Sequence, residues 1–263
     1  MTTLLKTDPD IIYPESDGQP MSENTEHYRW IVTIKENLEI LFAADANVFV
    51  AGDLLWYPRE KDLEEESAPR VGPDVMVIFG VPKGKRGSYL QWKEGNIAPQ
   101  VVFEIRSPGN KTGEMRGKFD FYQEYGVEEY YLYDFTRFTL DGWQRRGQML
   151  EPILNMNGWV SPRLGIRFLM TTADLEMYRP DGQKFLTTLE LEQERQQAEQ
   201  RAGQAEQRAG QAEQARDRER LLREQEQQLR AQAESKLAQL AASLSHLPQD
   251  QLRALGIDPE LLK

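Results

Sequence analysis

The sequence predicts an α+β fold, with a mixed central sheet flanked by helices and a long helix at the C-terminal end. A helical pattern is followed by several β-rich runs, then by a second helical pattern and more β-rich runs, an order typical of α+β domains. All 10 Phe, 10 Tyr and 5 Trp residues precede Glu190, so only the front of the chain can bury a large core. Behind Thr188 the sequence repeats every seven residues, which indicates a helix.

Composition bounds the classes of protein to which the chain can belong. Its 263 residues include no cysteine, which excludes disulfides, thiolate metal sites and cysteine nucleophiles. The N-terminus lacks a signal-peptide pattern, and no run of about 18 apolar residues occurs. We therefore expect a soluble, cytoplasmic protein with no membrane partner. The net charge of -11 disfavours nucleic-acid binding in general, but a groove that binds phosphates needs a positive field only locally.

The first half of the chain predicts an extension, a helix and two β-rich runs. Residues 1–20 are rich in proline and turn residues, which indicates extended chain. Residues 22–44 carry apolar side chains three and four positions apart, the pattern of an amphipathic helix, with Ser22 or Asn24 as its cap. The other elements expected here are strands over 47–57 and 75–79 and loops over 60–66 and 83–95.

The second half predicts a strand, a helix and another strand, followed by hairpins. Residues 100–107 (QVVFEIRS) form the first strand, and residues 129–134 form the second. Between them, residues 112–125 predict a helix with Gly126 as its C-cap. The core-facing side chains of this helix are Met115, Phe119 and Tyr122. Turn signals then mark hairpins at Asp141-Gly142, Asn157-Gly158 and Asp181-Gly182.

The chain beyond the hairpins predicts a polar helix. Residues 198–204 (AEQRAGQ) recur as 205–211, the heptad period of coiled coils. The stripe of residues along which two such helices would pack, the coiled-coil seam, is weak because it carries Ala and Arg. Gly203 and Gly210 also each lower the stability of the helix by about 1 kcal/mol relative to Ala. A single solvated helix and a loosely paired coiled coil both remain open. The expected segments are an N-terminal extension over 1–20, a main domain over 21–185, a helical or coiled-coil tail over 189–247 and, over 248–263, a short helix at about 252–262.

Two acidic residues occupy informative positions on neighbouring predicted strands. Asp74 follows Pro73 at the entrance of the strand 75–79, and Glu104 interrupts the apolar strand 100–107. A buried carboxylate is costly unless a cation or a metal compensates it, and two carboxylates together suit Mg²⁺. The alternative is that Glu104 pairs with Arg106, its neighbour on the same face of the strand.

A phosphodiester hydrolase also needs a cationic group near the attacking water. Arg106 lies two residues beyond Glu104, but arginine stays charged and cannot act as a base. Lys118 lies beside the core-facing stripe of the helix 112–125, where it can lean over the sheet. The alternative is an ordinary solvated helix lysine.

Five stretches of the sequence, by their order and spacing, resemble a known family. They are YPESDGQPM at 13–21, APRVGPDV at 68–75, VFEIRSPGN at 102–110, GEMRGKFDFY at 113–122 and GVEEYYLYD at 126–134. Together they resemble the Uma-type family of restriction-endonuclease-like proteins, a branch of the PD-(D/E)XK nuclease superfamily. The resemblance covers roughly residues 10–180. It implies a restriction-endonuclease-like α+β core that binds Mg²⁺ or Mn²⁺.

The resemblance also implies roles for individual residues. Asp74 matches the aspartate of the Pro-Asp motif, and Glu104 matches the strand glutamate. The superfamily's lysine normally lies two residues beyond the glutamate, where this chain has Arg106, and Lys118 matches a lysine displaced to the following helix. Superfamily members often draw a further metal ligand from the first helix, which favours Glu23. His27, four residues later, is expected to be a surface or groove residue.

Cationic residues near these motifs are the candidates for nucleic-acid binding. Those in the loop 83–95 are equally explained as a solvated charge run. The candidates are Arg106, Lys111, Arg116, Lys85 and Arg86, and Glu114 is expected to lie beside Arg116 at the edge of the groove.

The leading hypothesis is a metal-dependent endonuclease that hydrolyses DNA phosphodiester bonds. In this hypothesis Asp74 and Glu104 hold the Mg²⁺ or Mn²⁺ that activates a water, and Lys118 positions that water. The alternative is a catalytically weak nucleic-acid-binding or regulatory module with a helical self-association tail, which the acidic charge and the displaced lysine favour. The expected partners are DNA and further copies of the chain, bound through the domain or the tail.

Overall fold

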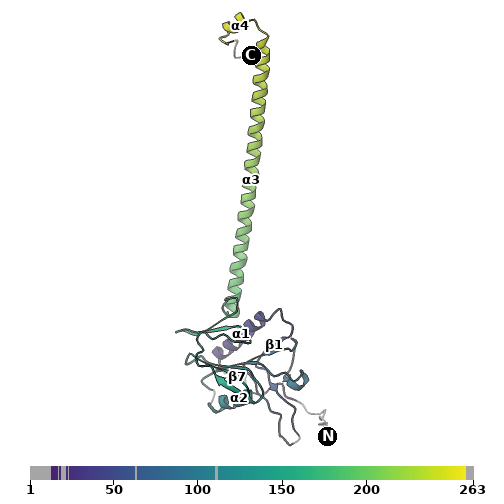
Figure 1. Cartoon of the computed structure of the whole chain (residues 1–263), viewed down its shortest axis with the longest axis vertical. Coiled ribbons are helices and arrows are strands. Elements are labelled where there is room, and N and C mark those ends of the chain that lie inside the picture. Colours follow the sequence, from purple (N-terminus) through teal and green to yellow (C-terminus); the bar gives the residue numbers. More distant parts are fainter. Residues whose placement is uncertain are drawn as a thin grey trace. The chain divides into compact units, whose positions relative to one another are not determined.

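The computed structural model describes residues 13–16, 18, 22, 24–62, 64–109 and 112–258. The chain divides into two compact units, Met1–Glu192 and Gln193–Lys263. The first unit holds the central sheet and its flanking helices, and the second consists mainly of the long helix α3 (Figure 1). The predicted α+β class, with a mixed sheet between helices and a long C-terminal helix, is confirmed. None of the described helices combines the length with the apolar character that a bilayer-spanning segment needs.

The central sheet has six strands in the order β1-β3-β5-β6-β7-β8. β5 and β6 pair in parallel, and the other neighbouring pairs of this sheet are antiparallel. Parallel neighbours need a crossover connection, which helix α2 (Thr112–Glu124) supplies between β5 and β6. The strands are β1 (Val48–Gly52), β3 (Val75–Phe79), β5 (Val101–Arg106), β6 (Glu129–Asp134), β7 (Thr139–Arg146) and β8 (Met149–Pro152).

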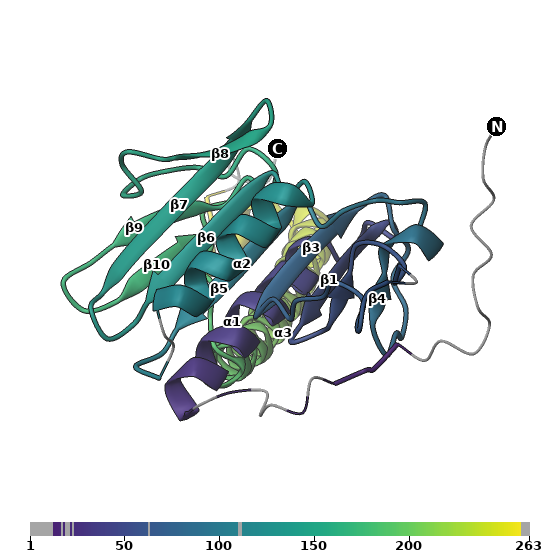
Figure 2. The same ribbon diagram turned by 90° about the horizontal axis from the view of Figure 1, so that it is seen from below.

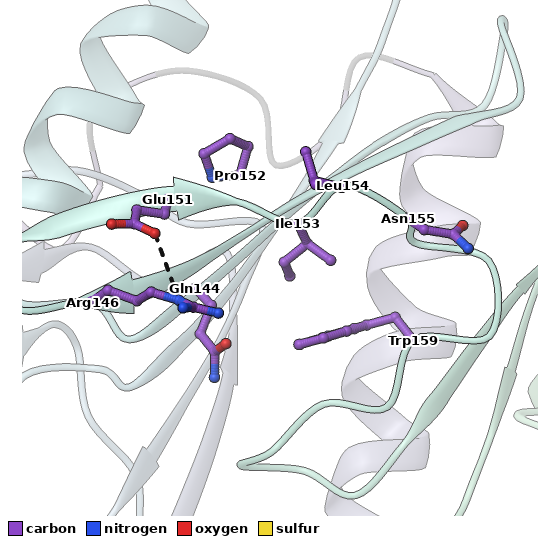
Figure 3. Close-up of a pocket in the computed structure, with 8 residues that line it drawn as sticks. All are labelled: Gln144, Arg146, Glu151, Pro152, Ile153, Leu154, Asn155 and Trp159. Carbon is purple, nitrogen blue, oxygen red and sulfur yellow. Dashed lines mark ion pairs between the residues drawn. The ribbon is translucent and has the colours of Figure 1, made fainter.

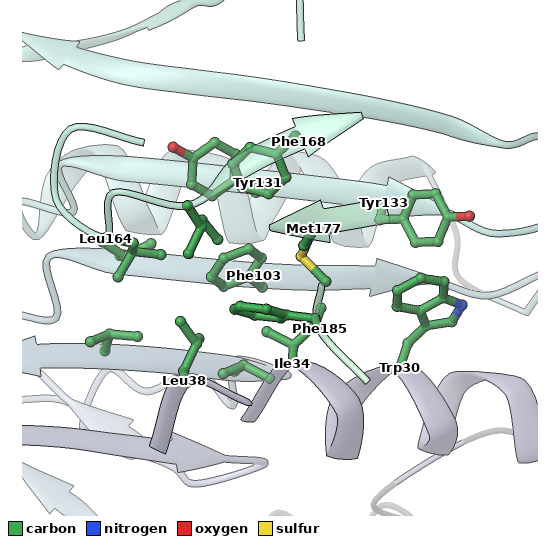
Figure 4. Close-up of a cluster of buried hydrophobic side chains, with 14 of the residues drawn as sticks. Trp30, Ile34, Leu38, Phe103, Tyr131, Tyr133, Leu164, Phe168, Met177 and Phe185 are labelled. Atoms are coloured by element: carbon green, nitrogen blue, oxygen red, sulfur yellow. The ribbon is translucent and has the colours of Figure 1, made fainter. Parts of the chain in front are cut away.

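Helix α1 (Thr25–Leu41) covers one face of this sheet. Asn24 caps it, because its side chain accepts a hydrogen bond from the His27 backbone N–H at 2.9 Å. A hairpin of β9 (Arg167–Met170) and β10 (Leu175–Tyr178) packs against the same core. Figure 4 shows this first core, whose members include Trp30, Ile34, Leu38, Phe103, Tyr131, Phe168 and Met177.

Helix α2 covers the opposite face. Because side chains alternate along a strand, Phe103 of β5 faces the first core while Val102 faces α2. A small parallel pair, β2 (Trp56–Tyr57) and β4 (Tyr89–Leu90), extends this second core. Figure 2 shows α2 lying over the sheet beside β5 and β6. The buried members of this second core include Trp56, Met76, Tyr89, Val102, Tyr122 and Tyr130.

The C-terminal end of α2 is fixed to the sheet by Arg145 of β7. Its guanidinium donates hydrogen bonds to the carbonyl oxygens of Gln123 at 2.6 Å, Val127 at 2.7 Å and Tyr122 at 3.2 Å. The last carbonyls of a helix have no partner within the helix, so a side-chain donor there replaces the missing bonds. The position of α2 along the sheet therefore depends on a strand two places away from β5.

A buried amide joins the end of the first unit to α1. The Asn37 side chain donates to the Leu186 carbonyl at 2.7 Å and accepts from the Leu186 N–H at 3.1 Å. It also donates to the Thr33 carbonyl at 2.8 Å. Asn37 is fully buried, as is nearly all of Phe185. The packed unit therefore extends to residue 186.

One predicted turn is wrong. Asp141-Gly142 lies inside β7 and makes no turn, whereas Gly158 (φ +84°) and Gly182 (φ +85°) do lie in turns as predicted. A Cβ on Gly142 would lie 2.4 Å from the Met156 sulfur. Glycine is needed at 142 because a core side chain approaches the strand backbone there. In the sequence, a glycine required by close packing looks the same as a glycine required by a turn.

Two predicted elements differ from the structure. The stretch 83–95, expected to be a loop, contains β4 and the 3-10 helix η1 (Gln91–Lys93). The charged residues of this stretch favour a loop in the sequence. Tyr89 is nevertheless fully buried and donates a hydrogen bond to the Ile97 carbonyl at 2.6 Å. The β-rich run 47–57 is two strands, because Asp53 adopts a left-handed conformation (φ 47°) between β1 and β2.

Helix α3 spans Thr188–Ser245, and none of its residues is buried. A reciprocal capping box starts it: the Thr187 backbone N–H donates to the Glu190 carboxylate at 2.8 Å, and the Glu190 N–H donates to the Thr187 hydroxyl at 3.3 Å. Ion pairs between Arg and Glu one turn apart line its surface. The short final helix α4 spans Gln249–Ala254 and ends before Gly256 (φ +71°), earlier than the predicted 252–262.

We expect a chain truncated after Glu192 to fold as the full chain does, because it keeps Phe185, Leu186 and the capping box. It should melt cooperatively with a Tm within about 4 °C of the full chain, a shift equivalent to ~1 kcal/mol for a domain of this size. Near-ultraviolet circular dichroism and calorimetry measure this. A chain ending at Lys184 is the matched control and should be much less stable, because it loses the partners of Asn37. A molten product from the longer truncation would contradict the expectation.

We expect the tail to raise the oligomeric state only weakly, because Ala and Arg occupy the candidate seam and the helix has many intrahelical ion pairs. Light scattering on the full chain and on the Glu192 truncation, over a series of concentrations, measures this. A monomer in both at every concentration would leave a single solvated helix, and a tight full-length oligomer would indicate a firm coiled coil.

Candidate functional site

Asp74 lies at the entrance of β3, directly opposite β5. In the antiparallel register Val75 pairs with Phe103, so one further step of the same register brings Asp74 opposite Glu104. The Asp74 carboxylate is nearly buried, with 8% of the residue exposed. Its Oδ2 accepts a hydrogen bond from the Ile105 N–H at 2.6 Å. The start of one strand is thus tied through a side chain to the backbone of the next.

His27 approaches the same carboxylate from the first turn of α1. Its Nε2 lies 3.1 Å from Asp74 Oδ2, and the residue is 6% exposed. The expectation that His27 lies at the surface or in a groove is therefore wrong. The signal that locates it is its spacing from Ile31 and Ile34, which puts it on the buried face of the helix.

Glu104 is 1% exposed and faces α2. Its Oε2 forms an ion pair with Lys118 Nζ at 2.8 Å, and its Oε1 accepts a hydrogen bond from the Tyr122 hydroxyl. The alternative pairing with Arg106 is not found: the Arg106 Nε lies 3.9 Å from the Asp134 carboxylate on β6. Two side chains of α2, one turn apart, therefore hold the glutamate.

Lys118 leans over the sheet from α2. Besides Glu104, its ammonium group donates to the Gly72 carbonyl at 3.1 Å, in the segment that leads to Asp74. Its neighbours in the helix, Met115 and Tyr122, are both buried and fix this orientation. Lys118 is not an ordinary solvated helix lysine. The structure thus brings Asp74, Glu104 and Lys118 together at one place.

The electrostatics of this cluster follow from its burial. Burial raises the pKa of the Glu104 carboxyl from 4.5 to about 7; Lys118 opposes this shift and Asp74 adds to it. For Lys118, burial lowers the pKa, but the carboxylates of Glu104 and Asp74 outweigh it, so the pKa is raised and the ammonium is protonated at neutral pH. Burial and then Glu104 raise the pKa of Tyr122 well above its ordinary value, so it stays a hydrogen-bond donor.

The other predicted site residues lie elsewhere. Arg86 pairs with Glu94 at 2.7 Å and lies over the Phe49 ring, toward the opposite end of β3 from Asp74. Arg116 pairs with Asp120 on the exposed side of α2. Lys85 is exposed in the segment after β3, and Glu114 is exposed on α2. Glu23 and Lys111 lie outside the described residues.

The donor chemistry of the cluster fits a hard divalent cation. Mg²⁺ is usually held by one or two carboxylates, with waters and substrate phosphates completing its shell. The Asp74 and Glu104 carboxylates supply two, and within the described part of the chain no hydrogen bond reaches Asp74 Oδ1. The described residues contain no group of three or more Asp, Glu or His arranged to hold a metal.

A separate concavity lies between the β7–β8 hairpin and the segment that follows it (Figure 3). Gln144 and Arg146 share the strand face of Gly142, which packs against Met156 of the first core, so this hollow opens on the side of α1. Glu104 faces α2, so the hollow is no part of the carboxylate cluster. Its lining residues are Gln144, Arg146, Glu151, Pro152, Ile153, Leu154, Asn155 and Trp159.

Comparison with known proteins places the chain in a family. The model of the Uma2 family, described as "Putative restriction endonuclease", matches residues 4–173. The chain belongs to the Uma2 family. Among solved structures, the Uma2 chain is similar to one from Anabaena variabilis described as "a putative nuclease belonging to DUF820". The identity is 14%, the match covers 53% of this chain and 72% of that one, and the TM-score is 0.40. No curated protein matches.

Two contacts in this Uma2 chain were not foreseen from its sequence. Tyr122 was assigned to the apolar face of α2, where it does lie, but its hydroxyl also contacts Glu104. His27 contacts Asp74. In both cases helical periodicity shows that the residue is buried, but not which polar group its side-chain tip meets. The sequence signal for such a contact is a side chain with a polar end on the buried face of a helix, four residues from another polar side chain, as with Lys118 and Tyr122.

We expect Glu104 to make the metal-free protein less stable as pH rises from 4.5 to about 7. Folded Glu104 still binds a proton in this window that the unfolded chain has released, so the free energy of unfolding falls with rising pH. Urea unfolding across this range, for the wild type and for Glu104→Gln, measures the effect. The variant should show a shallower decline. An equally steep decline in the variant would assign the effect to another group.

Proposed function

We propose that this Uma2 chain is a metal-dependent endonuclease that hydrolyses DNA phosphodiester bonds. The observation that carries the proposal is the convergence of three groups at one end of β3. One step beyond the printed register of β3 and β5, Asp74 comes opposite Glu104, and the Lys118 ammonium group contacts Glu104. Membership of the family described as "Putative restriction endonuclease" supports the reaction class.

Asp74 and Glu104 are the residues that would hold Mg²⁺ or Mn²⁺. When bound, the cation supplies Lewis-acid stabilisation of the charge on the phosphate and makes a nucleophile available at neutral pH. Burial raises the pKa of the Glu104 carboxyl and so favours its protonated form. Opposite charge from Lys118 favours the ionised form that a metal ligand needs.

Lys118 acts through its positive charge. Its pKa is raised, so at neutral pH it is an ammonium group and not a general base. A cation held in a nearly dry site stabilises negative charge on a phosphate more strongly than one in water. Its hydrogen bonds to Glu104 and to the Gly72 carbonyl fix the ammonium group between Glu104 and the segment that leads to Asp74 before substrate arrives. This preorganisation is the contribution we assign to Lys118.

A second candidate function is a nucleic-acid-binding module that keeps the fold without cleavage. One observation favours it: both oxygens of Glu104 are already engaged, one by Lys118 and the other by Tyr122. A carboxylate satisfied by protein donors does not require a metal to remain buried. If the chain binds DNA but calorimetry shows that it binds neither Mg²⁺ nor Mn²⁺, this result would favour the binding module over the endonuclease.

We expect Mg²⁺ or Mn²⁺ to be required for nicking of supercoiled plasmid, and to raise the Tm of the protein by mass action. Asp74→Asn and Glu104→Gln should lose both effects, because each removes a charged ligand. Lys118→Met should reduce the cleavage rate at least about 100-fold, the scale of losing one charge-stabilising donor. Gel assays of plasmid conversion and calorimetry with and without metal measure these outcomes.

Matched controls come from ion pairs outside the cluster. Glu128→Gln removes a carboxylate paired with Arg163, and Lys35→Met removes an ammonium group paired with Glu39. Both controls should cleave at the wild-type rate. Wild-type cleavage by Asp74→Asn would contradict the assignment of the site, and metal-independent cleavage would contradict the assignment of the cofactor.

A further inference from the structure

Two buried glutamates in neighbouring strands are each held by a buried tyrosine. In β5, Glu104 accepts a hydrogen bond from Tyr122. In β6, Glu129 accepts one from Tyr131 at 2.8 Å. Each glutamate is 1% exposed, and each tyrosine is fully buried. The same chemical pair thus occurs twice in one sheet, which allows a direct comparison of its two settings.

The setting of Glu129 is structural. Besides Tyr131, its carboxylate accepts hydrogen bonds from the Ser161 hydroxyl and from the Arg163 backbone N–H at 2.8 Å. These donors tie the segment before β9 to the central sheet. Glu129 lies in β6, three residues before Leu132, which pairs with Glu104 in the β5–β6 register. Its two donors outside β6 belong to this tie, and Tyr131 lies in β6 itself. It therefore represents what such a pair does when it only holds the fold together.

The setting of Glu104 differs in its neighbours. One oxygen accepts from Tyr122, the other forms an ion pair with Lys118, and Asp74 lies across the register. The Tyr122 hydroxyl is therefore the neutral donor of the proposed metal site.

The Tyr122 ring is held rigidly. It stacks on Trp56 with an interplanar angle of 2° and centroids 6.4 Å apart, and its centroid lies 5.2 Å from that of Tyr130. The Trp56 indole N–H in turn donates to the Gln91 side chain at 2.9 Å. A ring clamped in this way leaves its hydroxyl a fixed position. Glu104, in contrast, has three rotatable side-chain bonds that need restraint if its carboxylate is to keep one orientation.

We propose that Tyr122 is a positioning residue of the endonuclease site, which fixes Glu104 through Oε1. Oε2, which the Lys118 ammonium group contacts, has a second acceptor site that can take the divalent cation. This role rests on the function proposed above. A hydrogen bond to one oxygen stops rotation of the carboxylate and favours its ionised form. Groups that hold metal ligands in this way typically contribute 10- to 100-fold to metal affinity. Tyr122 itself touches neither metal nor substrate.

The test compares Tyr122→Phe with Tyr131→Phe. Each variant removes one hydroxyl from a buried tyrosine–glutamate pair and keeps the ring. Tyr131→Phe also removes the acceptor of the Trp159 indole N–H, so its thermal stability should fall at least as far as that of Tyr122→Phe. Mg²⁺ and Mn²⁺ binding is measured by calorimetry at a fixed pH on the full chain, and plasmid nicking is measured over a range of metal concentrations. We expect Tyr122→Phe to bind metal at least about 10-fold more weakly, with nicking recovered at high metal. Tyr131→Phe should keep the wild-type affinity.

A third variant controls for the loss of any buried hydroxyl in this core. The Tyr130 hydroxyl is buried and, within the described part of the chain, has no hydrogen-bond partner. Tyr130→Phe should therefore leave metal affinity unchanged. An equal loss of affinity in Tyr122→Phe and Tyr130→Phe would overturn the proposal, since the loss would then come from the core and not from the contact with Glu104.

The outcomes separate this proposal from the function on which it rests. If the wild type binds metal and Tyr122→Phe binds it equally well, the positioning role is overturned and the endonuclease is not. If the wild type binds neither Mg²⁺ nor Mn²⁺ and does not nick DNA, the endonuclease is overturned and this role with it. Should Tyr122→Phe fail to fold, the wild-type ultraviolet difference spectrum decides. Metal must perturb the tyrosine absorption, because Glu104 is the acceptor for Tyr122, and an unchanged spectrum overturns the role.

Discussion

Placing the Glu104 carboxylate in the middle of a covered sheet costs several kcal/mol unless charged or hydrogen-bonding groups compensate it. The groups that do so, Lys118 and Tyr122, both come from α2. Helix α2 therefore has to pack over β5 with these two positions facing inward, and the parallel pairing of β5 with β6 places it there as the crossover connection. Asp74 completes the arrangement from β3, while its bond to Ile105 fixes the end of that strand. The demand of one buried charge thus explains the arrangement of a helix and two strands.

Much of this fold follows from local sequence, and the exceptions have identifiable causes. The bounds of β3 and β6 are found directly, because their apolar runs are bordered by polar or turn residues. The crossover helix is found because Gly126 marks its end and its apolar residues recur at helical spacing. Gly142 misleads, since close packing and tight turns both require glycine and only the tertiary structure distinguishes them. Tyr89 is missed because its burial depends on pairing with a strand more than thirty residues away.

The candidate site divides in the same way. Asp74, Glu104 and Lys118 follow from charged residues at positions that have to be buried, and the family resemblance adds their expected roles. The structure brings these three together, while their roles in catalysis remain proposals. The buried position of His27 was not foreseen, because its contact with Asp74 joins residues 47 positions apart. The residues predicted to bind nucleic acid show the opposite error, because a side chain expected to be available for binding is already engaged within the protein. Arg86 is charged and lies in a loop-rich stretch, yet it is occupied by Glu94 and the Phe49 ring.

The bonds from Arg145 to the last carbonyls of α2 have a mechanical consequence. Tyr122, whose carbonyl Arg145 holds, lies one helical turn from Lys118. A helix secured at that end cannot slide along its axis, so Lys118 and Tyr122 keep their height above the sheet. The positions of Lys118 and Tyr122 in the cluster therefore depend on β7, a strand that contributes no residue to the cluster.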